Sequence, residues 1–175
     1  MLTTTEVDAV CEAFPDQLHR VAFPGLPARR TLYISEKARL LIEGEWPGMD
    51  SKQKGRWLAA RAVLESFVDG RWMTVKSRPK SRAEFAILCP HADEIWEIRD
   101  VNPRPSLRIL GSFATKDVFV ALDPYERSQL GAKGSVEWAN AIQDYKEHWD
   151  RLFNERRPMT GSFPDDYLSY ARYLD

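Results

Sequence analysis

Apolar side chains recur every three or four residues in two long segments, the spacing that places them on one face of a helix. The first segment predicts a helix near 52–69, with polar residues available to cap its start and Gly70 to stop it. The second predicts a helix over 136–154, which Ser135 can cap and Pro158 ends. Its apolar face includes two tryptophans and a tyrosine, so we expect it to pack across a sheet.

Two shorter helices are predicted nearer the N-terminus. The segment SEKARLLIEG has Ser35 as a candidate cap, Glu36 in its first turn and Gly44 as its stop. Another short helix is predicted over Thr5–Phe14. The rest of residues 1–30 is interpreted as an extended arm because it contains several helix breakers, which are Pro15, Pro24, Gly25 and Pro27.

Apolar and polar positions alternate between the two long helices, which is typical of β-strands. The alternation predicts strands near 94–100, 106–113 and 117–123, with a hairpin turn at ATKD between the last two. The segment RWMTV after Gly70 favours a further strand. We therefore expect a three- or four-stranded, mainly antiparallel meander over about 71–123. Helices, then a curved antiparallel sheet, then a helix predict the α+β fold class.

The length of 175 residues suits one domain with extensions. We divide the chain into an N-terminal arm (1–30), one α+β domain with a helical N-terminal part (31–157) and an aromatic C-terminal tail (158–175). The hydrophobic fraction of 43% and the charged fraction of 29% are typical of a soluble globular protein. No apolar run approaches the roughly 20 residues that a membrane span needs, so no membrane association is expected.

Charge and cysteine content narrow the functional classes. With 25 basic and 26 acidic side chains, the net charge of −1 does not indicate nucleic-acid binding, which would have to come from local clustering. Cys11 and Cys89 are the only cysteines, and they share no metal-ligand spacing. Two lone thiols, together with a start that lacks a signal-peptide pattern, predict a cytoplasmic protein.

Common catalytic motifs are absent from the sequence. It contains no phosphate-binding glycine loop, no G-x-S-x-G and no H-E-x-x-H. The scattered histidines His19, His91 and His148 are interpreted as packing or surface residues. The segment CPHADE brings Cys89 close to His91 and two carboxylates, but one such group without a partner segment is weak evidence for a metal. No metal or other cofactor is predicted.

Basic residues cluster in the segment RWMTVKSRPKSR, which has five basic side chains and no acidic one. One interpretation is a solvated loop and edge strand, where basic residues prevent pairing with another chain. The other is a phosphate-binding patch with an aromatic side chain available for stacking on bases. On this second interpretation the candidate RNA-binding residues are Trp72, Lys76, Arg78, Lys80, Arg82 and, further along the chain, Lys133.

Several short motifs resemble those of the RelE-type toxin superfamily, and more closely its HigB-like, phage-derived branch of toxin–antitoxin systems. In that family a strand ending in W/Y-E-[IL]-R precedes a strand beginning [YL]-R-I-L, followed by a hydrophobic strand, an aromatic–basic segment and an Ala- and Tyr-rich helix. The resemblance covers roughly residues 72–154. The matching segments are Trp96-Glu97-Ile98-Arg99, Leu107-Arg108-Ile109-Leu110, Val118–Leu122, Tyr125-Glu126-Arg127-Ser128 and Ala139–Tyr145.

This resemblance implies a RelE-like fold and a metal-independent endoribonuclease that cleaves messenger RNA on the ribosome, neutralised by a cognate antitoxin. Arg99 and Arg108 would line the concave side of the sheet, and Tyr125 and Arg127 would stack on a base and stabilise a phosphate. Arginine suits this task because its planar fork can hold two phosphate oxygens. The chain has Glu126 before Arg127, where the family commonly has consecutive basic residues.

Two other functions remain open from the sequence. The chain can keep the fold without the catalysis and act as a binding module for a protein or an RNA. It can also resemble the related ParE-type toxins, which inhibit DNA gyrase by binding to it. The residues present no obvious general base, and so do not decide between these functions and RNA cleavage.

Overall fold

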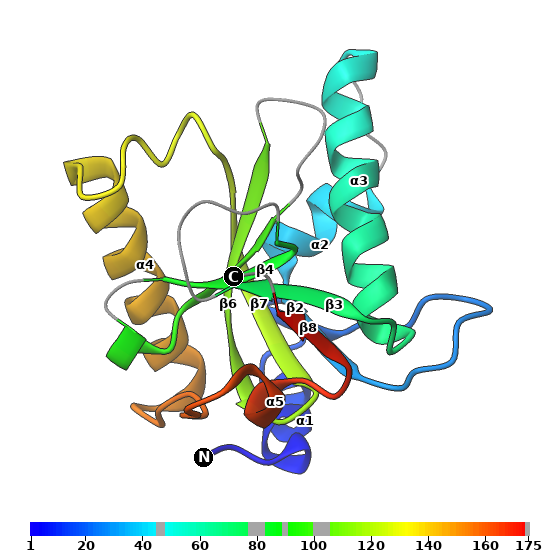
Figure 1. Ribbon diagram of the computed structural model, residues 1–175, viewed down its shortest axis with the longest axis vertical. Coiled ribbons are helices and arrows are strands. Elements are labelled where there is room, and N and C mark those ends of the chain that lie inside the picture. The colour runs from blue at the N-terminus through cyan, green and yellow to red at the C-terminus, as the bar shows by residue number, and fades with distance from the viewer. Residues whose placement is uncertain (45–47, 77–82, 89–90, 100–105, 174–175) are drawn as a thin grey trace.

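The computed structural model describes residues 1–44, 48–76, 83–88, 91–99 and 106–173, and Figure 1 shows their arrangement. The strands form one mixed sheet in the order β1-β2-β7-β6-β5-β4-β3-β8. The bounds of the strands are β1 Leu18–Arg20, β2 Thr31–Ser35, β3 Met73–Lys76, β4 Phe85–Ile87, β5 Trp96–Arg99, β6 Leu107–Thr115, β7 Val118–Glu126 and β8 Ala171–Tyr173.

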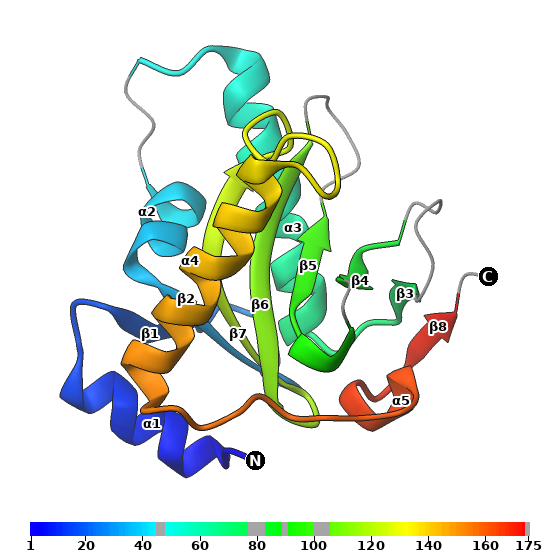
Figure 2. The same ribbon diagram turned by 90° about the vertical axis from the view of Figure 1, so that its left-hand side faces the viewer.

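Helices cover both faces of this sheet. Helices α2 and α3 pack on one face, and α1 and α4 on the other. In Figure 2 helix α4 runs in front of the sheet and α3 behind it. The bounds of the helices are α1 Thr4–Ala13, α2 Glu36–Glu43, α3 Ser51–Val68, α4 Val136–Phe153 and the short α5 Pro164–Tyr167. None of the described helices is long and apolar enough to cross a membrane.

The predicted helices are confirmed, and their caps explain their bounds. Asp50 caps α3 by accepting a hydrogen bond from the backbone N–H of Gln53, whose side chain bonds back to the Asp50 backbone. Ser35 caps α2 and Ser135 caps α4. Gly70 follows α3 with a φ of +74°, a backbone conformation that glycine adopts without strain.

The predicted antiparallel meander is confirmed for β4, β5, β6 and β7, which pair as consecutive neighbours. The expected size of the sheet was wrong, because the meander forms only its middle. Strand β2 pairs in parallel with β7, and β3 pairs in parallel with both β4 and β8. The fold class is therefore α+β as predicted, with an eight-stranded mixed sheet in place of three or four antiparallel strands.

Both chain ends contribute to this sheet. The segment interpreted as an extended arm (1–30) contains α1 and β1, and β1 pairs with β2. The tail (158–175) contains α5 and β8, and it supplies Tyr167 and Leu168 to the core that α2 and α3 share. The terminal segments therefore belong to the same packed unit as the meander.

Candidate functional site

The sheet places three of the predicted site residues in one row across neighbouring strands. Arg99 on β5 lies directly opposite Arg108 on β6, and Arg108 lies directly opposite Tyr125 on β7. Side chains that are directly opposite in a sheet point to the same face. This is the face that α4 covers, since Leu110, two residues after Arg108, packs with Tyr145 and Trp149 of that helix.

Glu97 joins the two arginines of this row into one ion-pair cluster. Its Oε1 lies 2.5 Å from Nη2 of Arg99, and its Oε2 lies 3.0 Å from Nε of Arg108. The exposed fraction of the side chain is 5% for Glu97, 14% for Arg99 and 15% for Arg108. A carboxylate buried this deeply needs opposite charge beside it, and the two guanidinium groups provide that charge.

Arg108 is further anchored along its own strand. Its Nη1 donates hydrogen bonds to Oγ of Ser106, at 2.9 Å, and to the carbonyl of Leu107, at 2.7 Å. These bonds, together with the contact to Glu97, hold the guanidinium in one orientation. A guanidinium fixed in this way is preorganised for binding an anion.

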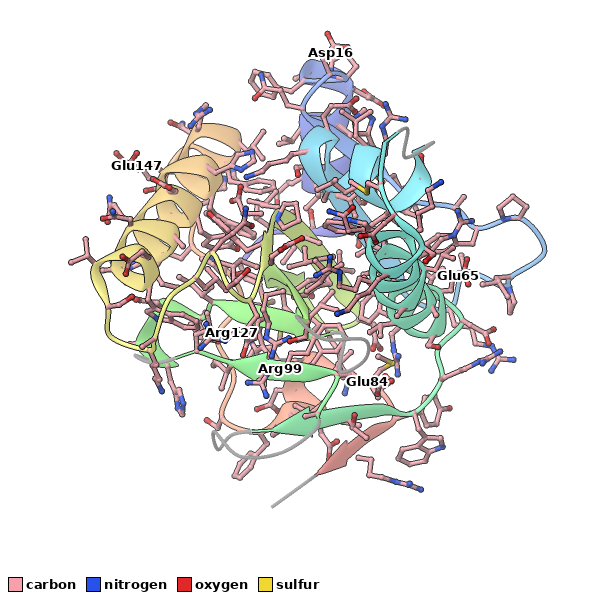
Figure 3. The ribbon with its side chains drawn as sticks, turned by 90° about the horizontal axis from the view of Figure 1, so that it is seen from above. Asp16, Glu65, Glu84, Arg99, Arg127 and Glu147 are labelled. Carbon is pink, nitrogen blue, oxygen red and sulfur yellow. The ribbon has the colours of Figure 1, made fainter. Side chains whose placement is uncertain are left out.

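Arg127 lies diagonally across from Arg108, beside Ser106, whose carbonyl accepts the backbone N–H of Arg127 at 2.8 Å. Its guanidinium donates to the carbonyl of Gly131 and lies 5.8 Å from the ring centroid of Trp138 on α4. In Figure 3, which looks from above, Arg127 is labelled nearer to α4 than Arg99 is. Arg127 therefore extends the row of arginines toward α4.

Tyr125 is half-buried at the end of the row. Burial, followed by the negative charges of Asp123 and Asp144, raises the pKa of its hydroxyl to about 12, so the phenol is protonated at neutral pH. Its ring also lies 5.1 Å from Nζ of Lys37. Beside it lies a pocket of about 420 Å³, whose lining includes Tyr125, Trp57, Asn140 and Asp144.

The proposed RNA-binding patch is only partly described. Trp72 is exposed and packs edge-on against Tyr170, with 5.6 Å between ring centroids, at the far side of β4 from the arginine cluster. Lys133 is exposed in the loop that precedes α4. The side chain of Lys76 and the residues Arg78, Lys80 and Arg82 lie outside the described part of the chain.

The sequence did not identify Glu97 as a possible proton acceptor beside both arginines. The motif W-E-I-R places Glu97 and Arg99 on one strand face, but the contact between Glu97 and Arg108 depends on the register between β5 and β6. A second missed contact joins Nδ1 of His148, on α4, to Oδ2 of Asp123 at 3.2 Å. Among the described residues, no group of three or more His, Cys, Asp or Glu side chains is arranged to hold a metal.

Comparison of the chain with protein-family models, with curated proteins and with solved structures gives no match.

Proposed function

We propose that this chain is a metal-independent endoribonuclease that cleaves messenger RNA on the ribosome and is neutralised by a cognate antitoxin, as the RelE-type toxins that it resembles are. In this proposal β5, β6, β7 and α4 correspond to the RelE-like core, and the other strands and helices are additions. The observation that carries the proposal is the single cluster in which Glu97 contacts both Arg99 and Arg108, in the same row as Tyr125.

The cluster contains the groups that metal-independent RNA cleavage needs. The Glu97 carboxylate accepts the proton of the ribose 2′-hydroxyl, and the 2′-oxygen then attacks the adjacent phosphorus. The bond from phosphorus to the 5′-oxygen breaks, which leaves a 2′,3′-cyclic phosphate on one product and a 5′-hydroxyl on the other. Arg99 and Arg108 stabilise the negative charge that develops on the phosphoryl oxygens.

Tyr125 is assigned as the group that protonates the leaving 5′-oxygen. The phenol is protonated at neutral pH, so the hydroxyl is in the donating state. The phenol regains its proton from solvent, and Glu97 releases its own proton to solvent. Proton and charge balance are therefore restored after each turnover.

A second candidate function is a RelE-fold binding module without catalysis. The low exposure of Arg99 and Arg108 favours it, because a buried ion-pair cluster can simply hold two strands together. In that case the cluster stabilises the sheet, and another surface binds the partner.

The rate of RNA cleavage by Arg108→Ala distinguishes these functions. Loss of one preorganised donor to a developing oxyanion lowers the rate about 100- to 1000-fold, so we expect a loss of that size with purified protein and ribosome-bound RNA. Arg20→Ala is the matched control, since Arg20 is an exposed arginine on the distant strand β1, where it pairs with Asp8 of α1. If neither the unaltered protein nor Arg20→Ala cleaves RNA, and cells that express the protein grow normally, the binding module is favoured.

A further inference from the structure

A pocket forms where β7 extends beyond its outer neighbour in the sheet. Strand β2 pairs only with Val118–Ala121 of β7, and the chain then turns into α2 at Glu36. Past this point, residues 124–126 of β7 line the pocket of about 420 Å³ together with residues from α2, α3 and α4. This volume falls within the range of small-molecule sites.

The exposed edge of β7 in this pocket is closed to another strand. Pro124 has no backbone N–H, so it cannot donate to an added strand. The backbone N–H of Glu126 already donates to Oε1 of Gln129, at 2.8 Å. The pocket is therefore suited to a compact group rather than to an extended peptide.

Aromatic and apolar side chains form one part of the pocket lining. Trp57 is buried, with 6% of its surface exposed, and Tyr125 is half-buried beside it. Leu41 and Met49 complete this apolar part. Flat aromatic rings and apolar side chains are the surfaces on which the unstacked bases of RNA pack.

Polar groups that can accept hydrogen bonds line the side formed by α4. The charged residues around the pocket are Lys37, Glu126, Glu137 and Asp144. Lys37 lies near Asp123, and Glu126 lies 3.6 Å from Nη2 of Arg56. Among the described residues Asp144 makes no ion pair, and Asn140 lies one helical turn before it on the same side of α4.

An ionised carboxylate accepts hydrogen bonds through two oxygens, so it best fits a ligand with two adjacent N–H donors. On its Watson–Crick edge guanine presents two such donors, the ring N1–H and the exocyclic amino group. Adenine, cytosine and uracil each present a donor beside an acceptor. The acceptor would face the carboxylate without a proton between them, so these bases fit the pocket less well.

The pocket is also next to the proposed cleavage site. Tyr125 lines it and lies directly opposite Arg108, on strands that are about 4.8 Å apart. A nucleotide with its phosphate at Arg108 therefore has this pocket beside its base. We propose that the pocket binds a guanine base next to the scissile phosphate, with Asp144 accepting its N1–H and amino protons. This inference rests on the proposed endoribonuclease function.

Binding of guanosine 3′-monophosphate and adenosine 3′-monophosphate to the full chain, measured by calorimetry, tests the proposal without requiring cleavage. We expect the guanine nucleotide to bind about tenfold more tightly or better, as one bidentate contact to a base provides. Asp144→Asn keeps the shape of the side chain but loses the second acceptor, and it should remove this preference. Asp150→Asn is the matched control, because Asp150 is exposed on the same helix and lines a different pocket.

Equal binding of the two nucleotides, or an unchanged preference in Asp144→Asn, would overturn the guanine assignment. Binding of arginine amide to the pocket in place of the nucleotide would also overturn it and would identify a site for a cationic side chain. The two proposals fail separately. Cleavage that depends on Arg108 but shows no guanine preference supports the endoribonuclease function and rejects the guanine pocket. Guanine binding without cleavage supports the guanine pocket and rejects the endoribonuclease function.

Discussion

At the scale of single residues, Glu97 determines what the arginine row can do. A guanidinium alone binds phosphate, but the proposed cleavage also needs a group that removes a proton from the 2′-hydroxyl. Glu97 lies within 3.0 Å of both arginines, so acceptor and cations are held together before any RNA binds. The same contacts also stabilise the fold. Variants of Glu97 must therefore distinguish its contribution to stability from its proposed role as proton acceptor.

Glu97→Ala should lower the free energy of unfolding by about 3–5 kcal/mol, because it removes the buried carboxylate that contacts both guanidinium groups. Glu97→Gln keeps an acceptor oxygen and should cost less stability, while it removes the proton acceptor and therefore cleavage. Urea denaturation of both variants checks the first expectation, with exposed Glu12→Ala as the control. A stability unchanged in Glu97→Ala would contradict the role of Glu97 in holding the arginines.

Glu94 provides a test through pH. Its carboxyl is buried, with 7% of the residue exposed, and it accepts a hydrogen bond from the Tyr167 hydroxyl at 2.5 Å. Burial raises the pKa of Glu94, although the Tyr167 hydrogen bond partly opposes this. A pKa raised by folding means that Glu94 contributes stability below its unfolded pKa of about 4.3, and this contribution is lost as pH rises through the folded pKa.

Glu94→Gln should therefore be more stable than the unaltered protein at pH 7, and the difference should shrink as pH falls toward 4. The amide can still accept the Tyr167 hydrogen bond, so the contact itself is kept. Urea denaturation at several pH values measures this difference. Glu147→Gln is the control, since Glu147 is exposed on the outer side of α4 (Figure 3), and a matching pH profile in both variants would contradict the argument.

At the scale of elements, the sequence predicts those helices and strands that have a clear local pattern of apolar, polar and turn residues. Strands β6 and β7 have nine residues each and are joined by a tight turn, so their length and the turn residues reveal them. Strands β1, β4 and β8 have three residues each, which is too short for a period of two to appear. Strand β2 is buried along nearly its whole length, so it shows no alternation.

The candidate site divides in the same way. Arg108 and Tyr125 lie opposite each other in the register that the turn sets, because the two register shifts between the turn and this pair cancel each other. The pocket beside Tyr125 cannot be predicted in this way. Its lining comes from α2, α3, β7 and α4, and contacts between elements so far apart in sequence leave no local pattern.

At the scale of the whole molecule, Arg30 ties the two ends of the chain to the core. It is buried, and its Nε lies 3.1 Å from Oδ1 of Asp117 in the turn between β6 and β7. It also donates to the carbonyls of Phe67 in the last turn of α3, of Arg71 after α3, and of Ser169 before β8. One side chain therefore joins the N-terminal segment, α3, the central hairpin and the C-terminal segment.

Arg30→Ala should lower the free energy of unfolding by about 3–5 kcal/mol, because it removes the charge partner of Asp117 and several donors to buried carbonyls. The neighbouring Arg29→Ala is the control, since Arg29 is exposed, and it should change stability by about 0.5 kcal/mol or less. Thermal and urea denaturation measure both values. Equal stability of the two variants would show that the terminal segments are held in another way.

The chemistry of the cleaved RNA ends tests the central claim most directly. A defined messenger RNA is incubated with purified protein in the presence and absence of ribosomes, and the product ends are identified by mass spectrometry. We predict 2′,3′-cyclic phosphate and 5′-hydroxyl ends with the unaltered protein, and intact RNA with Glu97→Gln that remains folded by circular dichroism. Intact RNA with the unaltered protein under both conditions, or the same ends at the same rate with folded Glu97→Gln, would contradict the proposed role of the Glu97–Arg99–Arg108 cluster.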